Sequence, residues 1–355
     1  MKFSIYRSWD EVDDPAFISQ WREWVDRSTD AHVFNHPSMV RVWTDTYRTL
    51  QEISPYYCVA TTESGSTIFL PLVIWRRNWK NGFLRMLVPA GLRDYDYHDP
   101  LVAGEVSAAE SGEFWKRIRE IEAGCGTRLF DEILLPCVRN QEHSDTWVPD
   151  EAICPYKDLR PYADFDEFFA GLGAKTRNTQ RRQMRLLEAL GRVEFHVFQR
   201  DENELALRSF PAFLDAHSQR WKNSYRTPGL HENIMRELFD TGIVHFSEIR
   251  IDSRPVSWEI GFRYKSKAYR YLGAFLEDYS KYSMANMHLV YLIKDCFSHG
   301  IDIFDHLRGG FSYKSSWSDG AVPLYKYSRQ CTHPSARMRL GAYRLLMQIK
   351  AFQSR

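Results

Sequence analysis

Three carboxylates, one imidazole and two phenols fall within one short stretch, Arg93-Asp94-Tyr95-Asp96-Tyr97-His98-Asp99-Pro100. A histidine flanked by carboxylates can keep a pKa suited to general base catalysis, so His98 and Asp96 are candidate catalytic residues. Asp94 and Tyr97 could bind a substrate hydroxyl or amine. A polar surface loop without a ligand explains the stretch equally well. No metal is expected, because no second group of ligands at helical spacing supports one.

Two further residues are candidate bases in the second half of the chain. Glu259 alternates with apolar residues in a predicted strand, and a carboxylate buried among them would have a raised pKa and could act near neutral pH. It could equally face water on the polar side of that strand. His217 lies on a predicted helix beside Arg220 and Trp221, where a structural role is the commoner one for a lone histidine.

An anion site is predicted where the strand Tyr269–Phe275 runs through LEDYSKYS into a helix over 284–298. Ser283 is suited to cap this helix with its side-chain oxygen. The free amides of the first turn and the helix dipole can hold a pyrophosphate, although most capped helices bind nothing. The candidate cofactor-binding residues are Leu272, Gly273, Tyr282, Ser283, Met284, Ala285 and Asn286.

Two basic segments have two interpretations each. The helix predicted over 175–190 carries Arg177 and Arg181, which either face solvent or bind the phosphates of a nucleotide-linked substrate. The segment 337–355 alternates apolar and basic residues. Such a helix can lie on an anionic membrane surface, but a terminal helix that covers its own domain is the commoner case.

Two domains are the default expectation for 355 residues, and the predicted elements repeat accordingly. The first half reads as helices over 14–27, 37–47 and 108–124 with strands over 56–62, 67–75, 84–89 and 128–135. The second half reads as helices over 166–172, 175–190, 202–221, 231–240 and 284–298 with strands over 193–199, 243–251, 256–264, 267–275 and 301–306. This repetition predicts two α/β units, 1–160 and 161–335, followed by a basic C-terminal helix over 336–355.

Composition excludes several classes of protein. The formal net charge of +1 lacks the basic excess typical of nucleic-acid-binding proteins. The longest apolar run, Ile68–Trp75, is too short to span a bilayer, and the N-terminus has no signal-peptide pattern. The six cysteines are scattered and form no C-x-x-C pair, which predicts neither a zinc site nor a disulfide framework. A cytoplasmic protein with reduced thiols is expected.

Three stretches of the second half resemble a known family: RWKNSYRTPGL, SRPVSWEIGFRYKSKAYRYLGAFLEDYSKYS and IDIFDHLRGGFSYKSSW. They are similar to the CelD/BcsL-type acetyltransferases of the GNAT superfamily, which carry their fold twice, like the FemAB-type aminoacyl transferases. The resemblance covers about residues 160–320 well and is looser upstream. One departure is Met284-Ala285, where family members usually have Pro-Gly.

The resemblance implies an α/β (α+β) fold of two tandem GNAT-like units, each a mixed, mostly antiparallel sheet flanked by helices. It also implies acyl-CoA as cosubstrate at the start of the 284–298 helix. Trp221, Tyr313 and Lys314 belong to its most specific motifs and are candidate substrate-binding residues.

The expected function is N-acyl transfer from acyl-CoA to a small-molecule amine, with a nucleotide-linked amino sugar for surface polysaccharide as the expected acceptor. Direct attack without an acyl-enzyme is expected, because no serine or cysteine lies in a recognisable nucleophile elbow. A FemAB-like aminoacyl transferase is one alternative, disfavoured by the near-neutral charge. A non-catalytic module that binds a glycan or a partner is another, supported by Met284-Ala285. A homodimer is a candidate assembly.

Overall fold

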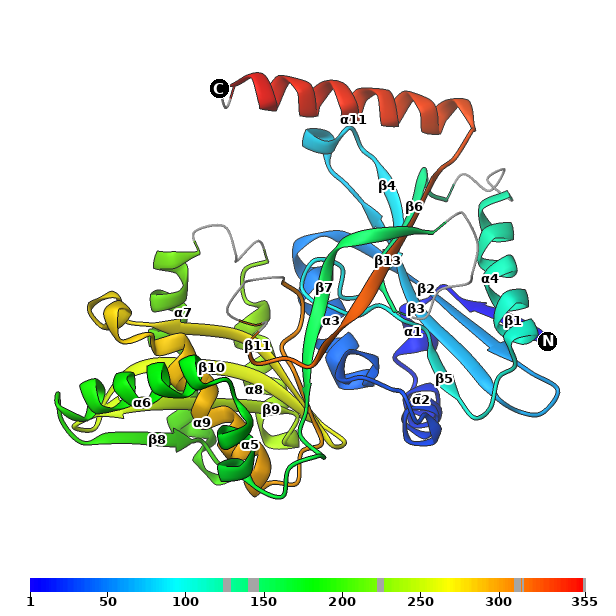
Figure 1. The fold of residues 1–355 in the computed structure, drawn as a ribbon. Helices are drawn as coiled ribbons and strands as arrows, with labels where there is room; N and C mark the ends of the chain where they lie inside the picture. Colours follow the sequence, from blue (N-terminus) through cyan, green and yellow to red (C-terminus); the bar gives the residue numbers. More distant parts are fainter. Residues whose placement is uncertain (124–128, 140–146, 222–226, 310–313, 315, 354–355) are drawn as a thin grey trace. The chain divides into compact units, whose positions relative to one another are not determined.

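The computed structural model describes residues 1–123, 129–139, 147–221, 227–309, 314 and 316–353 (Figure 1). The chain forms two compact units, Met1–Glu151 with Pro323–Arg355, and Ala152–Val322. The expected division was 1–160, 161–335 and 336–355. The difference arises because the last strand and helix return to the first unit, a tertiary contact that no local pattern encodes.

The first unit is built on a mixed sheet with the strand order β1-β2-β3-β4-β6-β13. Its strands are β1 (Lys2–Tyr6), β2 (Glu52–Thr61), β3 (Thr67–Arg76), β4 (Arg85–Pro89), β6 (Glu132–Val138) and β13 (Gly320–Gln330), with β5 (Leu101–Ala103) paired to β3. Only β4 and β6 pair in parallel among these described strands. The predicted apolar strand at 67–75 is β3, which is buried along that whole length.

The helices of the first unit are α1 (Trp9–Val12), α2 (Pro15–Arg27), α3 (Pro37–Leu50), α4 (Ala108–Ala123) and α11 (Pro334–Gln353). Alternate side chains of β2 and β3 point to opposite faces of the sheet. Trp21 of α2 packs against Tyr57 and Phe69 on one face. On the other face, Phe114 and Trp115 of α4 belong to a core that also contains the neighbours of Tyr57 and Phe69 in β2 and β3. The sheet is therefore covered on both sides.

The second unit has the strand order β7-β12-β11-β10-β9-β8. These strands are β7 (Val148–Asp158), β12 (Ile303–Asp305), β11 (Lys267–Phe275), β10 (Arg254–Tyr264), β9 (Val244–Ile251) and β8 (Val193–Val197). Pairing is antiparallel except between β11 and β12. The predicted class, mixed and mostly antiparallel sheets flanked by helices, is confirmed.

Helices cover both faces of this second sheet. They are α5 (Phe165–Gly171), α6 (Ala174–Glu188), α7 (Asn203–Arg220), α8 (Leu230–Leu238) and α9 (Met284–Ser298). His288 of α9 hydrogen-bonds Ser247 and Ser257 on one face. Phe210 of α7 packs against Phe246 on the opposite face. The sheet thus separates α9 from α7.

The cysteines differ in one respect from expectation. Cys58, Cys137, Cys154 and Cys296 are buried free thiols. Cys331 is disulfide-bonded, so the prediction of reduced thiols was wrong at that residue. No described helix is both long and apolar enough to cross a membrane.

Candidate functional site

The strands β11 and β12 part after the first third of β11. They pair only at Lys267, Ala268 and Tyr269, after which β11 continues to Phe275. At the same point the register of β11 against β10 skips Tyr271, which makes this residue a β-bulge. Beyond Tyr269, no described strand pairs with this edge of β11. Such an edge can pair with an extended ligand.

A buried ion pair lies beneath this edge. Arg270 Nε is 3.2 Å from both carboxylate oxygens of Glu259, and Arg270 Nη2 donates to Glu259 and to the carbonyl of Ala285 in α9 (3.2 Å for the latter). Burial raises the pKa of Glu259, while Arg270 and Lys314 oppose that shift. A cavity of about 20 Å³, with room for about one water, is lined here by both partners.

Glu259, a candidate base from the sequence, is therefore buried and bound by a guanidinium. It could accept a proton only by weakening its bond to Arg270. Through Arg270, which also donates to the carbonyl of Ala285, the pair joins β10 and β11 to the first turn of α9. Gly273 faces Glu259 across the strands, and a Cβ atom at Gly273 would lie 2.4 Å from Glu259 Oε1.

The opposite face of β11 carries two buried histidines. His231 of α8 stacks on the ring of the bulge residue Tyr271, with its Nε2 3.4 Å from the Tyr271 hydroxyl. Burial lowers the pKa of His231 to about 4, with His217 contributing, and burial likewise lowers the pKa of His217 to about 4. Both imidazoles are thus neutral at pH 7.

Sequence reasoning identified His217 but missed His231 and Tyr271. The one sequence feature that could have pointed to His231 is its position directly after RWKNSYRTPGL, a stretch that resembles the acetyltransferase family. The bulge that turns Tyr271 toward α8 depends on strand pairing, which the local pattern does not specify.

A pocket of about 350 Å³ lies between the last turns of α7 and the start of α8. It is lined by Leu214, Asp215, Ser218, Thr227, Pro228, Gly229 and Glu232. Ser218 and Glu232 are the chain neighbours of His217 and His231. Asp215 and Glu232 place two carboxylates on the lining, which favours a cationic ligand such as an ammonium group.

Cationic and aromatic groups follow at the end of α7. The guanidinium of Arg220 lies 4.6 Å from the ring of Phe275, the last residue of β11, and 6.0 Å from the ring of Trp221. Trp221, a candidate substrate-binding residue, is exposed. Arg220 therefore holds a positive charge where β11 ends.

The start of α9 differs from the predicted cap. Ser283 has a left-handed backbone (φ 55°), and its side chain makes no capping hydrogen bond. The 3₁₀ turn Glu277–Tyr282 leads directly into it. The prediction that the Ser283 side chain caps the helix was wrong, because this turn leaves Ser283 in a left-handed backbone and not in the extended one from which a side chain caps a helix.

The start of α9 nevertheless fits an anion. The carbonyl of Ser283 accepts from the N–H groups of Asn286 and Met287, so those of Met284 and Ala285 precede the first helical bond. Asn286 Oδ1 is buried without a hydrogen-bond partner among the described residues. Two backbone donors and the helix dipole are suited to a pyrophosphate, to which the Asn286 side chain can donate only through its Nδ2 group, since Oδ1 is an acceptor.

The loop 93–100 has structural partners inside the first unit. Trp43 and Tyr47 each donate to Asp94 at 2.8 Å, and burial raises the pKa of Asp94 to about 6. Asp99 binds the guanidinium of Arg139 at 2.6 Å. These contacts fix the loop to α3 and to the end of β6.

The other candidate residues of the loop 93–100 are Tyr97, His98 and Asp96. Tyr97 is buried under the guanidinium of Arg139 at 4.9 Å. The backbone N–H of His98 donates to the carbonyl of Cys137, and His98 is buried. Asp96 is half-buried. For His98, the favoured base from the sequence, these surroundings agree better with a structural role.

Three of the basic candidates bind groups of their own unit. Arg177 donates to the carbonyls of Ala170 (2.6 Å) and Leu172 at the end of α5. Arg181 is exposed and lies over the ring of Phe169. Lys314 Nζ is buried and donates to three consecutive carbonyls, His306, Leu307 and Arg308 (3.0, 3.4 and 3.2 Å). Tyr313 lies outside the described residues.

A metal ion in this chain would be held by a group of side chains that could bind it. Across the described residues, no three His, Cys, Asp or Glu side chains gather closely enough to hold a metal ion.

Residues 174–315 match the family model of the acetyltransferase (GNAT) domain. The matched segment runs from α6 through β12 and includes the parted strands and the start of α9. No functionally curated protein matches the chain.

Solved structures share the fold over the whole chain. FemX is 10% identical, covers 92% of this chain and 97% of its own, and has a TM-score of 0.57. The C-terminal domain of a putative lysylphosphatidylglycerol synthetase from Agrobacterium fabrum is 13% identical, with coverage of 92% and 97% and a TM-score of 0.52. A tandem GNAT protein from the clavulanic acid biosynthesis pathway is 8% identical, with coverage of 94% and 99% and a TM-score of 0.50.

At such identities the likeness shows the fold, which is that of two tandem GNAT-like units. The family match concerns the second unit, where residues 174–315 match the acetyltransferase (GNAT) domain, and it supports an N-acyltransferase activity for that unit.

Proposed function

We propose that the second unit transfers an acyl group from acyl-CoA to an amine. The observation that carries this proposal is the parting of β11 from β12 directly before the start of α9. One continuous segment, 270–286, thereby offers a strand edge for an extended ligand and a helix start for its anionic end. Acyl-CoA supplies an acyl group that is already activated as a thioester.

Each part of this segment would have a distinct task. The N–H groups of Met284 and Ala285, with the side chain of Asn286, would bind the pyrophosphate between Tyr282-Ser283 and the body of α9. The backbone of β11 around Leu272 and Gly273 would pair with the pantetheine. A backbone N–H directed at the acyl oxygen would stabilise the negative charge that develops there.

The α7–α8 side would receive the amine. Asp215 and Glu232 attract an ammonium group electrostatically, and this group must lose a proton before it can attack. His231, neutral at pH 7 and in contact with Tyr271, is the proposed proton acceptor, with His217 beside it. The resemblance to CelD/BcsL-type enzymes supports an amino sugar on a nucleotide carrier as the acceptor class, as a step toward surface polysaccharide.

Calorimetric titration of the full chain with acetyl-CoA tests the cosubstrate site. Ala285→Glu places a carboxylate among the proposed pyrophosphate donors and should weaken binding at least about tenfold, or about 1.4 kcal/mol. Ala174→Glu, the same change at the exposed start of α6, is the matched control and should bind as the unaltered chain does. Absence of acetyl-CoA binding in the unaltered chain would favour the non-catalytic alternative.

Release of the CoA thiol in the presence of candidate amines, with nucleotide-linked amino sugars first, tests the acceptor side. His231→Gln should lower kcat/KM by about 10²–10⁴-fold, the usual contribution of a general base. His299→Gln, at a more exposed histidine of the same unit, should leave it unchanged. A loss of less than about threefold in a folded His231→Gln protein would assign proton removal to water or substrate.

A further inference from the structure

Positive charge is concentrated at the C-terminal end of the chain. Residues 320–355 contain seven Lys or Arg and no Asp or Glu, although the whole chain has a formal net charge of only +1. Most of this segment is the helix α11, the terminal helix of the first unit (red in Figure 1).

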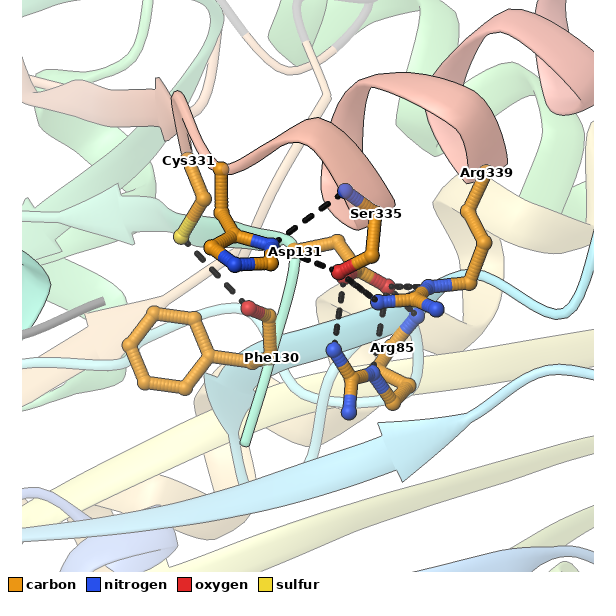
Figure 2. Close-up of polar contacts among 7 residues, drawn as sticks. Arg85, Phe130, Asp131, Cys331, Ser335 and Arg339 are labelled. Carbon is orange, nitrogen blue, oxygen red and sulfur yellow. Dashed lines mark hydrogen bonds and ion pairs between the residues drawn. The ribbon is translucent and has the colours of Figure 1, made fainter. Parts of the chain in front are cut away.

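One face of α11 is docked on its unit. Ala336 and Leu340 are buried. Asp131, fully buried, accepts from Arg339 Nε and Nη2 (2.8 and 2.6 Å) and from Arg85 Nη2 (2.9 Å), so that two guanidinium groups from different elements meet on one carboxylate (Figure 2). Burial by itself would raise the pKa of Asp131, but Arg339 and Arg85 lower it. The carboxylate therefore stays ionised and holds the helix in a fixed orientation.

The outward face of α11 is apolar. Met338, Leu345, Ile349 and Phe352 are 75%, 59%, 46% and 83% exposed. Their spacing of seven, four and three residues places them on one side of the helix, away from Ala336 and Leu340. Arg337 and Arg344 fall on one flank of this apolar face and Lys350 on the other.

Two more exposed apolar side chains lie on the turn around Trp79–Asn81. It packs on α11, since Lys350 Nζ donates to the carbonyl of Lys80 (3.1 Å) and a Cβ atom at Gly82 would lie 2.7 Å from the backbone nitrogen of Tyr343. Its two large apolar side chains, Trp79 and Phe83, are 62% and 64% exposed. Exposed apolar residues are normally scattered, so a group of six on one helix and its packed turn indicates a binding surface.

We propose that the outward face of α11, with Trp79 and Phe83, attaches the protein to an anionic lipid bilayer. Apolar side chains flanked by Arg and Lys are the pattern of helices that lie in a membrane interface, where Trp is also favoured. The positive charge of residues 320–355 favours an anionic bilayer over a second copy of the chain as the partner. Two copies joined through this face would bring two acid-free basic segments together, whereas an anionic bilayer neutralises them.

Co-sedimentation of the full-length protein with lipid vesicles tests this proposal. The protein should pellet with vesicles of phosphatidylcholine and phosphatidylglycerol, pellet far less with phosphatidylcholine alone, and lose binding as salt is raised. Leu345→Glu combined with Phe352→Glu should reduce vesicle binding by about tenfold or more. Both side chains are exposed, so the fold and acetyl-CoA affinity should not change.

Leu205→Glu combined with Leu186→Glu is the matched control, because it adds the same two charges at exposed leucines of the second unit. It should bind vesicles as the unaltered chain does. Binding that is equal for the α11 variant and the control would overturn the proposal. Failure to bind anionic vesicles, together with a concentration-dependent dimer that the α11 variant abolishes in sedimentation velocity, would assign the face to a second copy instead.

Discussion

At the scale of single residues, a buried charge beside a site can serve to position it. Glu259 has the burial expected of a tuned base, yet it is bound by Arg270, which also contacts the first turn of α9. A pair of this kind contributes little net stability over apolar residues, but the loss of one partner leaves the other charge buried and unpaired.

Glu259→Gln should therefore destabilise the protein strongly, by about 3–5 kcal/mol, because Arg270 loses its counter-charge. The double variant Glu259→Leu with Arg270→Met should recover most of that loss. Urea denaturation measures both. Glu204→Gln, which removes an exposed ion pair with Arg208 on α7, should change stability by less than about 1 kcal/mol. A small effect of Glu259→Gln would mean that water reaches the pair.

The sequence predicted chemistry-bearing residues better than their partners. It named Glu259 and His217, both of which are buried beside β11. It could not name Arg270 as the partner of Glu259, because their contact depends on the register between two strands. The same limit applies to Asp99 and Arg139, whose pairing joins segments 40 residues apart.

At the scale of elements, the local pattern predicted elements that have an apolar face and missed two polar strands that contain proline. The strands β9, β10 and β11 and the helix α9 lie within two residues of their predicted bounds. The strands β7 and β13 were missed. Pro149, Pro155 and Pro323 fall within them, and proline in a short polar run favours a loop. Their pairing with neighbouring strands outweighs that local preference.

The bulge beside the parted strands depends on Gly261. A Cβ atom there would lie 2.4 Å from the backbone carbonyl oxygen of Tyr269, and backbone cannot move aside as a side chain can. Gly261→Ala should therefore separate β10 from β11, destabilise the protein by about 1–3 kcal/mol and weaken acetyl-CoA binding.

Thermal denaturation and calorimetry measure the two effects. Gly112→Ala is the control, because Gly112 lies inside α4 and a Cβ atom there would enter open space. This change should raise stability by up to about 1 kcal/mol. A Gly261→Ala protein with unaltered stability and affinity would show that the bulge tolerates a side chain.

At the scale of the whole molecule, both units bury neutral histidines. Burial lowers the pKa of His32, His217, His231, His245, His288 and His306. His288 illustrates the cause: it is fully buried between the hydroxyls of Ser247 and Ser257, and the positive charge of Arg270 lowers its pKa further. The unfolded chain would protonate these rings near the ordinary histidine pKa of about 6.5.

Stability should therefore fall as the pH drops from 6.5 toward 4. The six histidines have lower pKa values in the folded state, so the unfolded chain takes up more protons in this pH range. The stability that their burial as neutral groups contributes is therefore complete only above pH 6.5. Asp94 acts in the opposite direction, since its pKa of about 6 favours the folded state at low pH. Glu132 and Glu259 act in the same direction as Asp94, because burial raises their pKa values as well, so three carboxyl groups oppose the six histidines. One pKa unit corresponds to about 1.4 kcal/mol, so the free energy of unfolding should still fall by more than about 3 kcal/mol. Urea denaturation at successive pH values measures it, and a constant free energy between pH 7 and 5 would contradict the burial of neutral histidines.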